Sequence, residues 1–207
     1  MDFVRPIEAI VPGAQGRVLS VLVETTAQLN LRTIAELAGV SQAQASRLLP
    51  RLVELGMVER SEVPPSSLFR LVPEHVASRA LLALARSTDS VMEEIGRLAA
   101  ALSHPPVSVI AFGSFARKEA DADSDIDLVV IRPADVAEDD DAWVESIESL
   151  RHGVRRLTGN PVDVLEISAD QAVTRASGRS QVWVDIRREG RVVFGLGLDN
   201  LRRARSA

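Results

Sequence analysis

The chain has 207 residues, of which 46% are hydrophobic and 26% are charged, and it carries a formal net charge of −5. It contains no cysteine, which excludes disulfide bonds and cysteine-ligated metal sites. No apolar run approaches the roughly 18 residues of a transmembrane helix, so we expect a globular protein that does not span a membrane.

The two parts of the chain differ in charge. Residues 1–73 carry seven Arg against seven Asp plus Glu, whereas the remainder is acidic. The length allows one or two domains, each with its own core. The sequence does not begin with a basic segment followed by a long apolar one, so we expect no secretory signal and a cytoplasmic protein.

Residues 14–73 show a succession of helical and hairpin patterns. An apolar stripe at helical spacing comes first. A further helix ends at Gly39, and Ser41 caps the next one, which covers residues 42–55. Two apolar stretches around a Pro64-Pro65 tip then predict a β-hairpin. This order of elements resembles the winged helix-turn-helix of bacterial transcription regulators.

The resemblance implies that the helix after Ser41 enters the major groove of DNA and that Arg60 and Arg70 flank the wing. Two features oppose DNA contact: Pro50 should kink or end that helix, and the segment is neutral overall. A winged helix used only for packing or protein contact is the alternative. The candidates to reach bases or phosphates are Ser41, Gln42, Gln44, Ala45 and Arg47.

Residues 74–103 form a long helical pattern with an apolar seam. The seam is spaced by alternating fours and threes, which is typical of a coiled coil. It predicts either a homodimer through residues 74–104 or a connector that packs on its own two domains. Pro105-Pro106 then marks the entry to a third segment. We therefore expect a winged helix domain at 1–73, a helical connector at 74–104 and a C-terminal domain at 105–207. The seam residues are Ala77, Leu81, Leu84, Thr88, Val91, Ile95, Leu98 and Leu102.

The most informative stretch is residues 107–131, where an apolar strand, a Gly113-Ser114 turn and a second apolar strand follow one another. In that second strand Asp125 and Asp127 project to one face while their apolar neighbours turn to the core. Paired carboxylates disfavour joint ionisation unless a cation such as Mg²⁺ lies between them. Gly113 allows close approach of the backbone to a ligand, and Ser114 would cap a helix at 115–120 and face a phosphate.

This stretch resembles the minimal nucleotidyltransferases of the DNA polymerase beta-type superfamily. It departs from the family pattern at Lys118, where glycine is usual; the lysine either changes the local backbone or contacts phosphate. The family needs a third carboxylate on a neighbouring strand, which Asp163 supplies, whereas Glu166 has the wrong parity. The matching residues are Gly113, Ser114, Ala116, Arg117, Ala120, Ser124, Asp125, Asp127 and Leu128.

Two other interpretations of the acidic stretch are less favoured. A calcium loop requires glycine at its sixth position, where this sequence has Ile126. A merely solvated acidic turn would not account for the Gly113-Ser114 pair at this spacing.

The remaining sequence predicts a helix over 141–157, a strand over 161–167 and a helix over 168–176. A last helix over 182–189 and a strand over 191–195 follow. Minimal family members often end on an I-x-x-E-G helix before a last strand, matched here by Ile186, Glu189 and Gly190. The expected fold class is α+β, with a winged helix-turn-helix, a connecting helix and a mixed β-sheet flanked by helices.

The resemblance implies a mechanism in which Asp125, Asp127 and Asp163 hold two Mg²⁺ ions and a nucleotide, ATP by expectation. Gly113, Ser114, Arg117 and Lys118 would bind the nucleotide. AMP would then pass to a hydroxyl of a protein, as in minimal nucleotidyltransferases paired with toxins, or of an RNA. The alternative is a non-enzymatic regulator whose nucleotidyltransferase domain senses nucleotide and tunes DNA binding.

Overall fold

The structure, a computed structural model, describes residues 1–175 and 178–200. The chain divides into two compact units, which we describe separately. The N-terminal unit contains residues 2 and 4–87, and the C-terminal unit contains residues 1, 3 and the described residues from 88 onward. In the described residues no helix is both long enough and apolar enough to cross a membrane.

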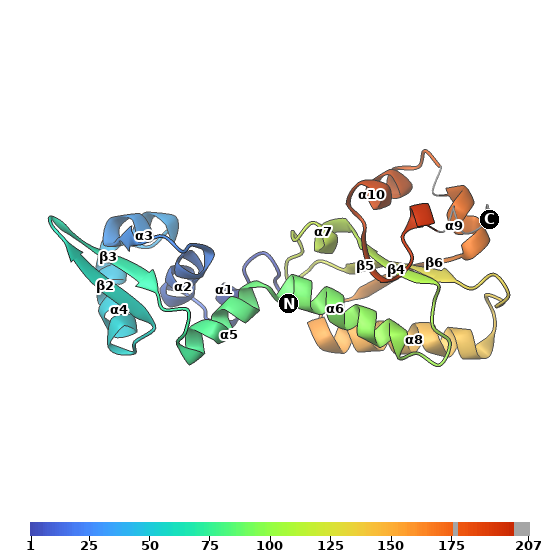
Figure 1. The fold of residues 1–207 in the computed structure, drawn as a ribbon, viewed down its shortest axis with the longest axis horizontal. Helices are drawn as coiled ribbons and strands as arrows, with labels where there is room; N and C mark the ends of the chain where they lie inside the picture. Colours follow the sequence, from blue (N-terminus) through green and yellow to red (C-terminus); the bar gives the residue numbers. More distant parts are fainter. Residues whose placement is uncertain (176–177, 201–207) are drawn as a thin grey trace. The chain divides into compact units, whose positions relative to one another are not determined.

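The N-terminal unit is a helical bundle with a small antiparallel sheet of order β1-β3-β2 (Figure 1). Its two longer strands form the predicted hairpin around Pro64-Pro65. Its elements are α1 Pro6–Ile10, α2 Ala14–Glu24, β1 Leu29–Asn30, α3 Leu31–Leu37, α4 Gln42–Glu54, β2 Val58–Val63, β3 Ser66–Leu71 and α5 Val76–Ala85.

Helix α4 begins at Gln42 and ends at Glu54, within one residue of the predicted range of 42–55. Ser41 and Gln44 form a reciprocal capping box at its start. The expectation that Pro50 kinks or ends the helix is wrong where it predicts an end, because α4 continues to Glu54. Leu49 and Leu52, on either side of Pro50, are buried in the core of the unit, and this burial favours continuation of the helix.

The predicted long helix over 74–103 is divided in two at Arg86, into α5 and α6 Ser87–Ala100. The first part of the apolar seam packs against the core of the N-terminal unit, through Ala77, Leu81 and Leu84. The second part belongs to the core of the C-terminal unit, where Val91 and Ile95 are buried. The seam therefore packs as the connector alternative expects, while a homodimer through 74–104 stays a prediction.

The C-terminal unit is a four-stranded mixed sheet of order β6-β5-β4-β7. Strands β5 and β6 are parallel, and the other two pairs are antiparallel. After α6, its elements are β4 Ser108–Phe112, α7 Gly113–Ala116, β5 Ile126–Arg132, α8 Asp141–Thr158, β6 Val162–Ser168, α9 Ala169–Arg175, α10 Gln181–Glu189 and β7 Arg191–Gly195. The helix expected over 168–176 corresponds to α9, and its last position lies outside the described residues.

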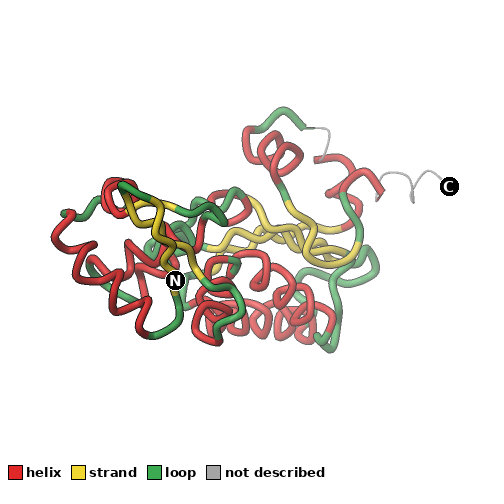
Figure 2. Tube along the Cα trace, turned by 60° about the vertical axis from the view of Figure 1, so that its left-hand side comes forward, coloured by secondary structure: helices red, strands yellow, loops and turns green. Residues whose placement is uncertain are grey.

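Helices cover both faces of this sheet, as Figures 1 and 2 show. One face packs on α6 and α8, with Val109, Leu128 and Trp143 in the core. The opposite face packs on α9 and α10, with Ile110 and Val129 in a second core. Alternate residues of each strand thus enter different cores, and both units together confirm the predicted α+β class.

Candidate active site

The Gly113-Ser114 turn follows β4 and leads into the short helix α7. Gly113 has a φ of +68°, and a Cβ atom there would lie 2.2 Å from Oδ2 of Asp127. Glycine suits this position, because a side chain here would strain the backbone and displace the Asp127 carboxylate that lies against it. Ser114 was expected to cap a helix at 115–120; instead it lies inside α7, which ends at Ala116. The half-buried Ser114 therefore offers its hydroxyl without a capping role.

The expected carboxylates lie at one end of two adjacent strands. Asp127 pairs in register with Asp163 across the parallel β5 and β6. Ile126 and Leu128 are fully buried on the α6 and α8 face, so Asp127 points to the opposite face. Asp125 directly precedes β5 and is exposed, as is Asp163. The strand alternation predicted from the sequence thus brings Asp127 and Asp163 together.

Asp127 has a raised pKa. Burial is the main cause, followed by the charges of Asp163 and Asp125, while Arg117 opposes the shift. Among the described residues, no group of three or more His, Cys, Asp or Glu side chains is already gathered at metal-binding distances. The donors are nevertheless oxygen ligands whose negative charges crowd one another, and a divalent cation would relieve that crowding.

The two cations after α7 are each paired with carboxylates. Arg117 donates from Nη1 to Glu189 at 2.6 Å and from Nε to Glu119 at 2.7 Å. Lys118 Nζ lies 2.8 Å from Asp89 of α6. The φ of Lys118 is +64°, which is the left-handed conformation that favours glycine.

Asn160 supports the loop before β5 and was not singled out in the sequence. Its fully buried amide Nδ2 donates to the carbonyl oxygens of Asp121 and Ser124, at 3.1 and 2.9 Å. Asp121 also accepts from the Ser124 hydroxyl, and hydrogen bonds of this kind lower the pKa of Asp121. The only local signal for Asn160 was its position between Gly159 and Pro161. That pattern predicts a turn but does not predict which groups the Asn160 side chain contacts.

Glu166 lies on the other face of β6 from Asp163. Its Oε1 accepts from Arg132 Nε and from Trp143 Nε1, both at 2.8 Å. These partners lie on the α8 side of the sheet. Glu166 therefore takes part in a buried structural contact, as its parity in the strand indicates.

On the winged helix, most of the residues expected to face DNA are exposed. Ala45 is the exception: it is fully buried, so the expectation that it reaches bases is wrong. Part of the Gln44 amide is used by the capping box. Arg47 donates only to the Ala43 carbonyl, and in the described part of the chain it forms no ion pair. The exposed residues are Ser41, Gln42, Gln44 and Arg47.

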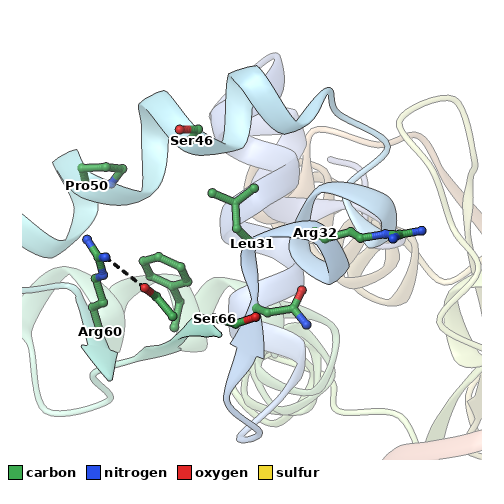
Figure 3. A pocket seen from close by; sticks show the side chains of 9 residues that line it. Leu31, Arg32, Ser46, Pro50, Arg60 and Ser66 are labelled. Atoms are coloured by element: carbon green, nitrogen blue, oxygen red, sulfur yellow. Dashed lines mark hydrogen bonds between the residues drawn. The ribbon is translucent and has the colours of Figure 1, made fainter. Parts of the chain in front are cut away.

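A cavity of about 480 Å³ opens between α4, the start of α3 and the wing (Figure 3). Arg60 crosses it, donating to Ser67 at 2.9 Å and lying 6.0 Å from the centre of the Phe69 ring. Arg60 is also paired with Glu62 at 2.7 Å. The lining residues are Asn30, Leu31, Arg32, Ser46, Pro50, Arg60, Ser66, Ser67 and Phe69.

Three solved structures resemble parts of this chain. A crystal structure of a toxin-antitoxin with AMP-PNP is 15% identical, with a TM-score of 0.38, and the match covers 55% of this chain and 82% of that one. NadR in complex with 4-hydroxyphenylacetate is 21% identical, with a TM-score of 0.32 and coverages of 45% and 71%. TrmBL2, an archaeal chromatin protein, is 15% identical, with a TM-score of 0.31 and coverages of 89% and 74%. With TM-scores below 0.5, these similarities carry no argument about function.

Family comparisons agree with the division of the chain. The model of the nucleotidyltransferase domain family matches residues 95–186, and the model of the MarR family matches residues 11–66. A search of curated proteins finds no match. The chain therefore joins an N-terminal MarR-family winged helix domain to a nucleotidyltransferase domain, as its motifs predict.

Proposed function

We propose that the C-terminal unit is a Mg²⁺-dependent enzyme that transfers AMP from ATP to a hydroxyl of a macromolecule. The observation that carries this proposal is the pairing of Asp127 with Asp163 on adjacent parallel strands, with Asp127 against the Gly113-Ser114 turn. Carboxylates beside a turn that admits a phosphate form the arrangement that metal-assisted phosphoryl chemistry requires.

Asp125, Asp127 and Asp163 would hold two Mg²⁺ ions. The fit is supported by their oxygen donors and by the raised pKa of Asp127, which burial causes first and the negative charges of Asp163 and Asp125 second. When bound, the ions would stabilise negative charge on the attacking and leaving oxygens.

The protein's own groups would position the substrates. The backbone at Gly113 and the hydroxyl of Ser114 would bind the β- and γ-phosphates. Asp163 would accept the proton of the acceptor hydroxyl as its oxygen bonds to the α-phosphorus and the bond from that phosphorus to the bridging oxygen breaks. Arg117 would neutralise the pyrophosphate that leaves. Lys118 would have to release Asp89 to reach a phosphate, so we assign it a secondary role.

The test is incubation of the full chain with Mg²⁺, cell lysate and each nucleoside triphosphate radiolabelled at its α-phosphate. We expect a labelled protein or RNA band with ATP and none when the label is on the γ-phosphate. The band should disappear with Asp125→Ala/Asp127→Ala and persist with Asp123→Asn, an exposed acid of the same loop. Binding of nucleotide without any labelled band would instead favour the regulator that senses nucleotide.

We also propose that the winged helix binds DNA through α4 and the wing. The exposed polar face of α4, with Arg47 outside any ion pair of the described residues, supports this. A DNA phosphate in the adjacent cavity would replace Glu62 as the partner of Arg60. Glu62→Gln should therefore raise the affinity for duplex DNA, and Arg60→Ala should lower it. Equal affinity of all three proteins in a gel-shift titration would exclude this contact.

A further inference from the structure

The I-x-x-E-G stretch at the end of α10 contains one residue that packing does not explain. Ile186 is buried in the core between the sheet and the α9 and α10 helices. A Cβ atom on Gly190 would lie 2.4 Å from the Ile186 carbonyl oxygen and 3.0 Å from Ile110, so glycine lets the helix end against β4. Glu189, between them, contributes to neither contact.

The carboxylate of Glu189 is directed at Arg117. Its Oε1 accepts from Arg117 Nη1 at 2.6 Å, and its side chain is only 13% exposed. The other carboxylate on Arg117, Glu119, is 63% exposed. A charge-assisted hydrogen bond is stronger where less water competes, so the less exposed Glu189 holds the guanidinium more firmly than Glu119 does.

Arg117 bonds to two glutamates, Glu119 and Glu189, and its charge also acts on the carboxylate of Asp127. It belongs to the segment that follows the Gly113-Ser114 turn, and among the charges near Asp127 it is the one that favours ionisation of that carboxylate. Without Glu189, the guanidinium would keep only its contact with the exposed Glu119 and would be freer to turn toward the negative charge of Asp127. A pair between Arg117 and Asp127 would occupy a carboxylate that a metal ion needs and would turn the cation away from an incoming phosphate.

We propose that Glu189 is a positioning residue that holds the Arg117 guanidinium off Asp127 and directs it at the polyphosphate of the nucleotide. This inference rests on the proposed function. By this inference, the glutamate of the I-x-x-E-G stretch acts at the nucleotide site through Arg117, from which it is separated by 72 residues in the chain.

The test measures binding of ATP, in the presence of Mg²⁺, by equilibrium dialysis with the full chain. Glu189→Gln should weaken binding about tenfold, because the amide can still accept from Arg117 but lacks the negative charge that makes this hydrogen bond strong. Arg117→Ala should weaken binding at least as much. The double variant should bind no more weakly than Arg117→Ala alone, because Glu189 acts through Arg117.

Asp185→Asn is the matched control. Asp185 lies one turn earlier on the same helix, and its substitution removes the same charge. It pairs not with Arg117 but with Arg188, which also lies 3.4 Å from Glu189. We expect its affinity for ATP to stay within about twofold of wild type. Thermal melting of each variant separates a folding defect from a binding defect. If Glu189→Gln does not fold, Arg117→Lys tests the same contact, since it keeps the charge and loses the forked geometry.

Three results would overturn the inference. Wild-type affinity of Glu189→Gln would mean that the contact does not position Arg117. Additive losses in the double variant would mean that Glu189 acts independently of Arg117. Absence of ATP binding by the wild-type protein, with the other three nucleoside triphosphates also inactive, would remove the proposed function and this inference with it.

Discussion

At the scale of single residues, Asp127 lies where negative charge is costly. The residue is half-buried and pairs in register with Asp163 on the adjacent strand. Asp125 lies two residues before it in the chain. A raised pKa in the folded state means that the stability conferred by the neutral carboxyl is lost as the pH rises through that pKa. At neutral pH the ionised Asp127 therefore destabilises the folded protein, which is common at functional sites.

Asp127→Asn should accordingly raise the thermal midpoint of the metal-free protein at neutral pH while reducing AMP transfer at least about 100-fold. Added Mg²⁺ should raise the midpoint of the wild type and leave that of the variant unchanged, because a ligand that binds the folded state stabilises it. Calorimetry in EDTA and in Mg²⁺ measures both effects. A variant that melts below the wild type in EDTA would contradict the charge argument, and Asp123→Asn serves as the neutral control.

Lys118 allows the cost of its backbone conformation to be separated from the benefit of its ion pair. Lys118→Gly and Lys118→Ala both lose the contact with Asp89, and they differ only in the Cβ atom at a φ of +64°. The glycine variant should therefore be more stable than the alanine variant by about 1 kcal/mol. Urea unfolding of the two variants, compared at equal slopes, gives the difference directly. Equal stabilities would show that the left-handed conformation is not retained.

Sequence patterns predicted which way side chains point along each strand of the candidate site. They did not predict contacts between segments that are far apart in the chain. Strand alternation places Asp127 opposite its apolar neighbours, and the same parity separates Asp163 from Glu166. No such rule links Arg117 to Glu189, because that contact depends on how α10 packs against α7. The sequence left open whether Lys118 changes the local backbone or contacts phosphate, and it gave no sign of the ion pair with Asp89.

At the scale of elements, the sequence predicted the helices and strands better than their ends. Pro50 removes one hydrogen bond of α4, yet the buried leucines on both sides keep the helix intact to Glu54. At the connector the error was of the opposite kind. The unbroken apolar seam predicted one helix, and the structure has two helices divided at Arg86. In α4 burial of the apolar face carries the helix past Pro50, and at the connector the two parts of the seam pack into different cores.

Pro50→Ala tests this explanation of α4. The substitution restores an amide hydrogen for the Ser46 carbonyl and removes the clash of the proline ring, while giving back some freedom to the unfolded chain. We expect the N-terminal unit to gain about 1 to 2 kcal/mol. Denaturant unfolding of the full chain, followed by a probe specific to that unit, measures the gain. Arg51→Ala, an exposed neighbour on the same helix, should change stability by less than about 0.5 kcal/mol. A loss of stability in Pro50→Ala would mean that the proline is accommodated by a distortion the helix needs.

At the scale of the whole molecule, charge limits what the two units can bind. The chain carries a net charge of −5, and residues 1–73 are neutral. Several arginines of the N-terminal unit are already paired with carboxylates, as in Arg32 with Glu36, Arg60 with Glu62 and Arg70 with Glu59. Few cations remain to release counterions from DNA, so non-specific affinity should be low and depend weakly on salt.

Arg47 provides the sharpest test of whether the two units work separately. Because Arg47 forms no ion pair among the described residues, Arg47→Ala should weaken binding to duplex DNA and lower the slope of log affinity against log salt by about 1. The affinity of the Arg47→Ala variant for ATP should not change, since Arg47 and the carboxylates of the candidate nucleotide site belong to different compact units. Asp127→Asn should give the converse result, with DNA affinity retained and Mg²⁺-dependent ATP binding lost.

Arg79→Ala, which removes a charge from α5 in the same unit as Arg47, controls for net charge. Fluorescence anisotropy with labelled duplex, at several salt concentrations and with or without ATP and Mg²⁺, measures all of these quantities. A DNA affinity that changes with ATP in the wild type and not in Asp127→Asn would contradict independence, because it would require a free energy of coupling between the nucleotide site and the winged helix.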